Sequence, residues 1–390
     1  MFKIIKYDKL DIYNEVLFFL TFFLYQFFLV VSYSSVFAKN LYIKSIASNA
    51  IKLSFLLIIL VNVYDFLRGK FHLKEILVFF IIGLVFIISY RNYHEGASLV
   101  SLLYIAATRN IDIKKIMKVF ILSLFMGILF NFLSNIFLQI SDGTKIEYRY
   151  GVERIRYALG FTLPAFLPHF FLSLVCAIGL NENIKKIIDY IVIECLNIAL
   201  FILTDTKNVF LCINLFLILH FILTRYKIEL FYKIIGFISI FSHPFGALSI
   251  YFISLIYNPN IKLFSFLNYL TSGRIELTHN GIMRWGFKLF GQQTDMSLDA
   301  LNYTYVDSAY MNILIQSGLV VLIIIVIFLM ISTYSAYKKK NVVLVISFLI
   351  ITIHGVFDTQ LNVVPFNPTI FYIYPMVTYF FNNLIVIRNH

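Results

Sequence analysis

Two kinds of side chain in this 390-residue sequence could carry out chemistry on a charged substrate. Arg156 stands directly before an apolar run, and Arg274 and Arg284 lie in the longest polar segment. A guanidinium can bind phosphate oxygens bidentately. His354 and Asp358 are four residues apart, so they share one helix face, where such a pair can transfer a proton. These residue types suit a reaction that needs both an anion-stabilising group and a base.

Tyrosines surround another carboxylate further along the polar segment. Tyr303, Tyr305 and Tyr310 flank Asp307. Tyrosine has an apolar ring and a hydroxyl, which match the two kinds of surface on a sugar. We therefore predict that the three tyrosines bind a glycan. The alternatives are an interfacial aromatic belt, arginines that snorkel to the membrane surface, and a purely structural His–Asp pair.

The elements that must position these residues are membrane helices. Hydrophobic residues make up 60% of the chain, charged residues only 13%, and the mean hydropathy is +0.86. The apolar stretches do not alternate with polar residues, as strands of a membrane barrel would. The sequence predicts an all-α polytopic membrane protein, a single integral membrane domain over residues 1–390 with about 12 transmembrane helices. The spans are expected near 15–38, 46–64, 74–90, 96–108, 116–139, 157–180, 187–204, 208–224, 232–257, 308–335, 341–357 and 367–387.

Lysine and arginine concentrate in alternate short connections, for example 109–118 and 338–340. Cytoplasmic loops attract these residues. This pattern predicts that both termini are cytoplasmic and that the large loop 258–307, before the tenth span, faces outward. The net charge of +12 then reflects topology and contact with anionic membrane lipids. Nucleic acid is excluded as a partner, because no basic soluble domain exists to bind it.

Within the large loop, residues 275–289 are expected to form an amphipathic helix on the outer leaflet. Gly286 and Gly291 are typical of a helix end and a turn. The apolar side of this helix would comprise Ile275, Ile282, Trp285, Phe287 and Leu289.

Several known signatures of chemistry do not occur in the sequence. It contains no P-loop, no GxSxG elbow and no HExxH motif. The three cysteines, Cys176, Cys195 and Cys212, fall inside apolar stretches and have no zinc-site spacing. We therefore expect no metal site and no cofactor.

Three motifs, in this order, resemble those of bacterial O-antigen and capsular repeat-unit polymerases of the Wzy type. They read RYALGF at 156–161, SGR…NGIMRWGFKLFGQ…YVDSAYMNILIQSGL at 272–319, and HGVFDTQLN…FNP at 354–368. The resemblance extends to the architecture of most of the chain. One departure is that Thr162-Leu163-Pro164 stands where many members of the family have His-Pro-Asn.

The resemblance implies a metal-independent glycosyltransferase in the bacterial cytoplasmic (inner) membrane. The donor would be a glycan on undecaprenyl diphosphate, and the acceptor a lipid-linked repeat unit whose hydroxyl attacks the anomeric carbon. Arg156, Arg274 and Arg284 would stabilise the departing diphosphate. The candidate bases would be His354, Asp358 and Asp307, of which His354, oriented by Asp358, is favoured. A chain-length regulator and a flippase of the same pathway are the implied protein partners.

Other function classes stay open. An O-antigen ligase shares the architecture and chemistry of the polymerase but transfers the glycan to the lipid A core. A lipid-linked oligosaccharide flippase also has about twelve spans, but short loops. A membrane scaffold would not need cations, histidine and aspartate on one side of the membrane.

Overall fold

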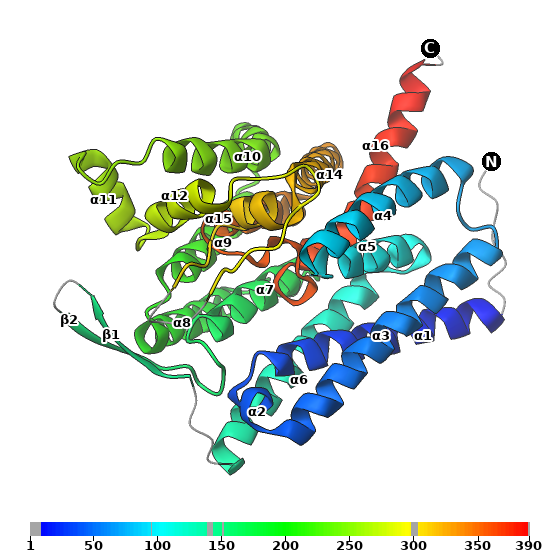
Figure 1. The fold of residues 1–390 in the computed structure, drawn as a ribbon. Helices are drawn as coiled ribbons and strands as arrows, with labels where there is room; N and C mark the ends of the chain where they lie inside the picture. Colours follow the sequence, from blue (N-terminus) through cyan, green and yellow to red (C-terminus); the bar gives the residue numbers. More distant parts are fainter. Residues whose placement is uncertain (1–8, 95, 139–142, 150–151, 298–302, 389–390) are drawn as a thin grey trace. The chain divides into compact units, whose positions relative to one another are not determined.

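The structure, a computed structural model, describes residues 9–94, 96–138, 143–149, 152–297 and 303–388 (Figure 1). The large loop predicted over 258–307 therefore has five residues, 298–302, outside the described ranges. The helices of the first part are α1 (Lys9–Ser32), α2 (Ser35–Lys39), α3 (Leu41–Leu67), α4 (Leu73–Tyr93), α5 (Ala97–Ala107), η1 (Thr108–Asn110), α6 (Ile113–Leu138), α7 (Phe166–Leu180), α8 (Ile187–Thr204) and α9 (Lys207–Arg225). The remaining helices are α10 (Glu229–Leu255), α11 (Lys262–Leu270), α12 (Arg274–Trp285), α13 (Ala309–Asn312), η2 (Ile313–Ser317), α14 (Leu319–Lys338), α15 (Val342–Phe357), η3 (Gln360–Asn362), η4 (Val364–Phe366), η5 (Pro368–Tyr372) and α16 (Ile373–Arg388).

The membrane class predicted from composition is confirmed. Eight helices in the described ranges are long and apolar enough to cross a membrane, and three further apolar helices are shorter. Such helices satisfy their own backbone hydrogen bonds, which lipid cannot do. Each of the twelve predicted stretches contains a helix, whereas the number of true spans and the orientation of the termini stay predictions.

Contacts divide the chain into two compact units, each with its own core. The first comprises 1–75, 103–213 and 364–371. Its central helix α1 packs on α3 and α6, and aromatic rings fill the interior. Phe22 lies edge-on to Phe371 at 4.7 Å between ring centroids and to Tyr104 at 5.7 Å. Because aromatic rings bury large areas, this cluster ties the short 364–371 segment to α1.

The second unit comprises 76–102, 214–363 and 372–390. Here α10 packs on α12, α13, α14 and α15, and α14 also packs on α16. A buried polar contact joins three of these helices. His243 of α10 lies 2.7 Å from the Thr352 hydroxyl on α15 through Nδ1 and 3.1 Å from the Thr333 hydroxyl on α14 through Nε2. This contact fixes the position of α15 along its axis relative to α10 and α14. The last turn of α15 carries His354, and the helix ends at Asp358.

The sequence did not predict a β-hairpin, which the structure contains before α7. Strands β1 (Lys145–Arg149) and β2 (Val152–Arg156) pair antiparallel, and Lys145 lies opposite Arg156. The sixth predicted span, 157–180, is therefore wrong at its start, because α7 begins only at Phe166. Two consecutive left-handed residues, Leu159 (φ 51°) and Gly160 (φ 90°), turn the chain between hairpin and helix.

The tenth predicted span, 308–335, is not one helix. It divides into α13, the π-helical turn η2 and α14, with Gly318 at φ 102° and ψ 162° between the last two. Backbone groups at this break form hydrogen bonds with the segment that follows α12 instead of within a helix. Leu319 N–H donates to the Lys288 carbonyl at 3.0 Å, and Gln292 N–H donates to the Gln316 carbonyl at 3.0 Å. An apolar sequence does not reveal such pairing.

The twelfth predicted span, 367–387, also starts later than expected. The 3₁₀ turns η4 and η5 occupy 364–372, and α16 begins at Ile373. Proline lacks an N–H and disfavours helix in the residue before it, so Pro365 and Pro368 break the helical pattern. The Asn367 side chain accepts a hydrogen bond from the Thr369 N–H at 3.0 Å and closes one of these turns.

The amphipathic helix predicted over 275–289 is confirmed in part. Helix α12 covers 274–285 and ends at Gly286, whose φ is 60°, as expected. Its predicted apolar side is wrong for Ile275 and Ile282, which are 3% and 8% exposed and pack inside the protein. Their burial follows from the contact of α12 with α10. The preceding helix, α11, has no buried residue.

We predict that Gly318→Ala destabilises the protein by about 2–6 kcal/mol, the sum of backbone strain and steric overlap. A Cβ at this position would lie 2.3 Å from the Gly291 nitrogen and 2.5 Å from the Leu289 carbonyl oxygen, and backbone cannot move aside. The measurement is the melting temperature in detergent. Gly83→Ala is the control, because its added Cβ meets nothing within 4 Å, and equal melting of the two variants would contradict the prediction.

Candidate active site

The second unit contains a cluster of ionic side chains around one guanidinium. Arg274 Nη2 donates to Asp358 Oδ1 at 3.3 Å, and Arg274 Nε lies 3.7 Å from Asp307 Oδ2. The Tyr303 hydroxyl donates to the other oxygen of Asp307 at 2.7 Å. Arg274 Nη1 points to the Thr271 carbonyl at 3.5 Å. One arginine thus joins two carboxylates that are distant from it in the sequence.

Local backbone geometry positions each of these groups. Arg274 is the first residue of α12, directly after Gly273, which adopts φ 87°. Asp358 is the residue at which α15 ends, and its extended backbone (φ −141°, ψ 146°) directs the chain out of the helix. Asp307 comes from the irregular segment before α13. Three chain segments therefore meet at the Arg274 side chain, which is 23% exposed.

His354 lies next to this cluster, as the four-residue spacing predicted. Its Nε2 is 3.6 Å from Asp358 Oδ2, and the two side chains are 4% and 7% exposed. The Asp358 N–H also donates to the His354 carbonyl at 2.9 Å. At 3.6 Å the side chains form an ion pair on protonation of the imidazole rather than a short hydrogen bond. Asp358 thus lies between a permanent cation and a titratable one.

Burial and charge together determine the ionisation of the cluster. Burial disfavours the charged guanidinium, but the carboxylates of Asp358 and Asp307, and then Tyr303, outweigh it and raise the pKa of Arg274. Burial, followed by the adjacent Asp307 carboxylate, raises the pKa of Tyr303 well above its usual value. Tyr303 is therefore held as a neutral hydroxyl that donates its hydrogen bond to Asp307.

The other two predicted glycan-binding tyrosines have different surroundings. Tyr305 is partly exposed in the same irregular segment and is close enough to Tyr303 to act on its ionisation. Tyr310 is fully buried, and its ring lies near Gly246 of α10, 3.6 Å from where a Cβ would be. A sugar ring has no access to Tyr310 in this arrangement, so helix packing accounts for it.

Arg284 does not belong to the Arg274 cluster. It lies ten residues further along α12, which corresponds to about 15 Å along the helix axis. Arg284 pairs with Asp295, and the side chains are 50% and 65% exposed. The indole N–H of Trp285 donates to the other oxygen of Asp295 at 2.8 Å. The sequence offered no signal for this contact, because Asp295 follows ten residues later in an irregular segment.

Arg156 belongs to the first unit, at the end of β2. Its Nε donates to the Thr204 carbonyl at 2.8 Å, where α8 ends. The neighbouring Arg154 pairs with Asp205 at 2.7 Å. These contacts attach the hairpin to the connection between α8 and α9.

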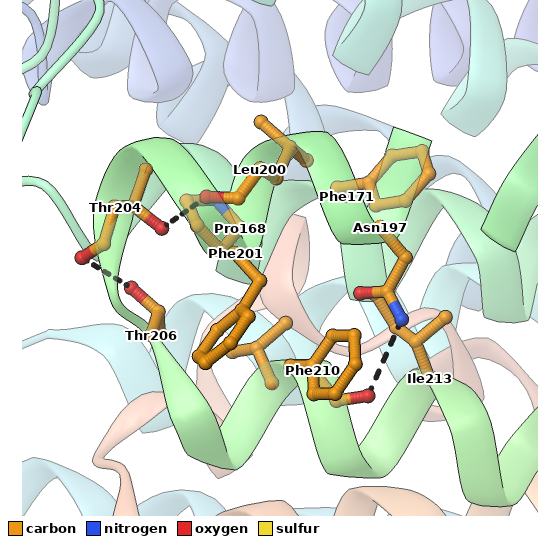
Figure 2. Close-up of a pocket in the computed structure, with 10 residues that line it drawn as sticks. Pro168, Phe171, Asn197, Leu200, Phe201, Thr204, Thr206, Phe210 and Ile213 are labelled. Atoms are coloured by element: carbon orange, nitrogen blue, oxygen red, sulfur yellow. Dashed lines mark hydrogen bonds between the residues drawn. The ribbon is translucent and has the colours of Figure 1, made fainter. Parts of the chain in front are cut away.

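The same connection borders a crevice between α7, α8 and α9 (Figure 2). Figure 2 shows the Asn197 amide donating to the Phe210 carbonyl, and the Thr206 hydroxyl directed at the Thr204 carbonyl. Apolar rings and these paired polar groups fill the space, which does not admit even a water molecule. The crevice is a packing feature and not a sugar-binding pocket.

The Arg274 cluster can hold and move protons, because it combines a buried imidazole with carboxylates and a hydroxyl donor. Carboxylate oxygens also bind cations. Here Asp307 and Asp358 each direct one oxygen to Arg274. Sequence reasoning did not include the Thr271 carbonyl, which completes the surroundings of the guanidinium.

No family model matches the chain, and neither a curated protein nor a solved structure shows significant similarity to it.

We predict that the Asp295 contact survives to a lower pH than an ordinary aspartate would allow. The Trp285 N–H, and then Arg284, hold the pKa of Asp295 below its usual value. The contact is therefore fully present above the usual value and is lost as the pH falls through the lowered one. Trp285 is the single tryptophan, so its fluorescence reports the change.

The measurement is an acid titration of this fluorescence in detergent, with a midpoint expected below about 3.9. Asp295→Asn should remove the transition. A midpoint at or above the ordinary value, or a transition that persists in Asp295→Asn, would contradict the assignment.

Proposed function

We propose that this protein is a membrane-embedded polysaccharide polymerase, which joins lipid-linked oligosaccharide repeat units without a metal ion. The observation that supports it best is that residues of two separate motifs meet in one cluster. Arg274 and Asp307 come from the motif at 272–319, and His354 and Asp358 come from the motif at 354–368. A membrane protein that gathers a base, an orienting carboxylate and a cation suits transfer between lipid-linked sugars.

The base acts on the acceptor sugar. We assign proton abstraction from the acceptor hydroxyl to His354, with Asp358 stabilising the imidazolium that forms. The hydroxyl oxygen attacks the anomeric carbon of the donor, the bond from that carbon to the diphosphate oxygen breaks, and polyprenyl diphosphate leaves with the electron pair. Tyr303 and Tyr305 lie close to Asp307 and to each other, as residues that contact the sugar would.

The surroundings of Arg274 change its predicted role. Two carboxylates face this one guanidinium, so the cluster offers no excess of positive charge to a diphosphate. We therefore propose that Arg274 positions Asp358 and Asp307 and keeps them ionised, instead of binding the leaving group. The diphosphate roles of Arg156 and Arg284 stay predictions, and the weak, exposed Arg284–Asp295 pair could exchange its partner for an anion.

The first experiment is a gel of surface polysaccharide from a bacterial strain that lacks this gene. A single attached repeat unit in place of a ladder would support a polymerase, because export and ligation continue without it. Complete loss of attached repeats would instead identify a flippase or a ligase. An unchanged ladder would remove the protein from this pathway.

Arg274→Ala is expected to abolish polymer without loss of the protein from the membrane, because both carboxylates lose their counter-charge. His354→Ala should lower the rate by about 10²–10⁴-fold, the usual contribution of a general base. The readout is the polymer ladder together with the amount of protein in the membrane fraction. Lys288→Ala, an exposed cation of the same loop, is the control. Polymer of normal length from the Arg274→Ala variant would refute the proposed positioning role of Arg274.

A pH profile separates the positioning role of Arg274 from diphosphate binding. Arg274→Gln removes a positive charge beside the His354–Asp358 pair, a charge that disfavours protonation of the base, so the acid limb of the rate profile should move to higher pH. Arg274→Lys keeps the charge and should leave the limb in place while lowering the rate. Both variants are compared in detergent with purified lipid-linked substrate. If both instead raise the KM for the donor and leave the limb unmoved, Arg274 binds the diphosphate.

A further inference from the structure

Helix α11 has an exposed apolar side that no part of the described chain covers. Leu263, Phe266 and Leu270 are 62%, 57% and 57% exposed, and Tyr269 beside them is 53% exposed. The first three recur at i, i+3 and i+7, so they form one stripe along the helix. None of the nine residues of α11 is buried. Exposure of this apolar stripe to water would be energetically unfavourable.

The opposite side of α11 is polar and attached to the protein. The Asn268 amide donates to the Tyr257 hydroxyl at 3.2 Å and to Glu276 at 3.0 Å, and its oxygen accepts from the Glu276 N–H at 3.1 Å. The Ser265 hydroxyl donates to the Pro259 carbonyl at 2.6 Å. These bonds fix α11 beside the end of α10 and the first turn of α12, with the stripe directed away from both.

Along the chain, the stripe comes shortly after the exposed apolar face of a candidate membrane span. Helix α10 ends at Leu255, and its exposed large residues recur along one face up to the start of the connection to α11. This face comprises Phe245, Leu248, Phe252 and Ile256, which are 72%, 54%, 54% and 61% exposed. A spanning helix presents such a face to lipid. Since the end of a span lies at the membrane surface, α11 lies at the same level.

We propose that α11 lies in the surface layer of the bilayer, with Leu263, Phe266 and Leu270 inserted among the lipids. Tyr269 and Lys262 suit this position, because tyrosine favours the interface and a lysine can extend its ammonium to the headgroups. The occupant of the stripe is therefore lipid. The interfacial role that the sequence suggested for 275–289 belongs to this shorter helix.

This placement has a consequence for the candidate active site, which rests on the proposed function. Only Thr271, Ser272 and Gly273 separate α11 from Arg274, and the Thr271 carbonyl faces the guanidinium. The depth of α11 in the bilayer thus fixes the height of Arg274 above the lipids. A substrate carried on a lipid presents its reacting sugar at a constant height, which a site anchored in this way would match.

Depth-dependent quenching of tryptophan fluorescence tests the placement. The full chain is prepared with Trp285→Phe and one new tryptophan, either Phe266→Trp on the stripe or Ser265→Trp on the attached side. Both are reconstituted in vesicles of phosphatidylcholine and phosphatidylglycerol that contain lipids brominated near the headgroup end of the acyl chain. Leu263→Trp replaces Phe266→Trp if that variant does not fold.

The tryptophan at 266 should emit at shorter wavelength than the one at 265 and lose more of its emission to bromine. Equal quenching of the two, or none, would overturn the proposal. Emission at short wavelength without quenching would also overturn it, because a second copy or another protein would then cover the stripe. The measurement uses no substrate, so its failure is distinguishable from failure of the polymerase assignment.

Discussion

The ion pairs of Arg274 are the contact on which the candidate site depends. A partly buried guanidinium is costly unless carboxylates compensate its charge, and partly or fully buried carboxylates need a cation for the same reason. Removal of one partner would leave the others uncompensated, typically at about 3–5 kcal/mol. The contact therefore joins α12, the segment before α13 and the end of α15 more firmly than their apolar packing alone would.

The broken tenth span pairs with part of the segment that follows α12. In a continuous helix from 308 onwards, these backbone groups would bond within the helix. Instead, the π-helical turn and Gly318 leave backbone groups that pair with 288–292. Residues 288–292 are thereby held beside the start of α14, within the second unit.

The sequence was sufficient for the helices and for the His354–Asp358 pair, because hydropathy and the four-residue helical spacing depend only on local order. It was not sufficient for the breaks at 157–165 and 313–318, since long-range backbone pairing decides them. The prediction that Ile275 faces the outer leaflet was wrong for a related reason. An apolar stripe indicates burial but does not distinguish a protein surface from a lipid surface.

The balance of charges in the Arg274 cluster limits which kinds of ligand the cluster can bind. The sequence predicted that Arg274 binds a diphosphate, yet a guanidinium already facing Asp307 and Asp358 has little attraction left for an anion. The same balance favours a neutral partner that can both donate and accept hydrogen bonds, because such a partner disturbs no ion pair. Sugar hydroxyls have these properties, and the Tyr303 oxygen, whose proton is donated to Asp307, can accept a hydrogen bond from one of them. Under the proposed function, the cluster would thus suit the acceptor sugar better than the lipid diphosphate.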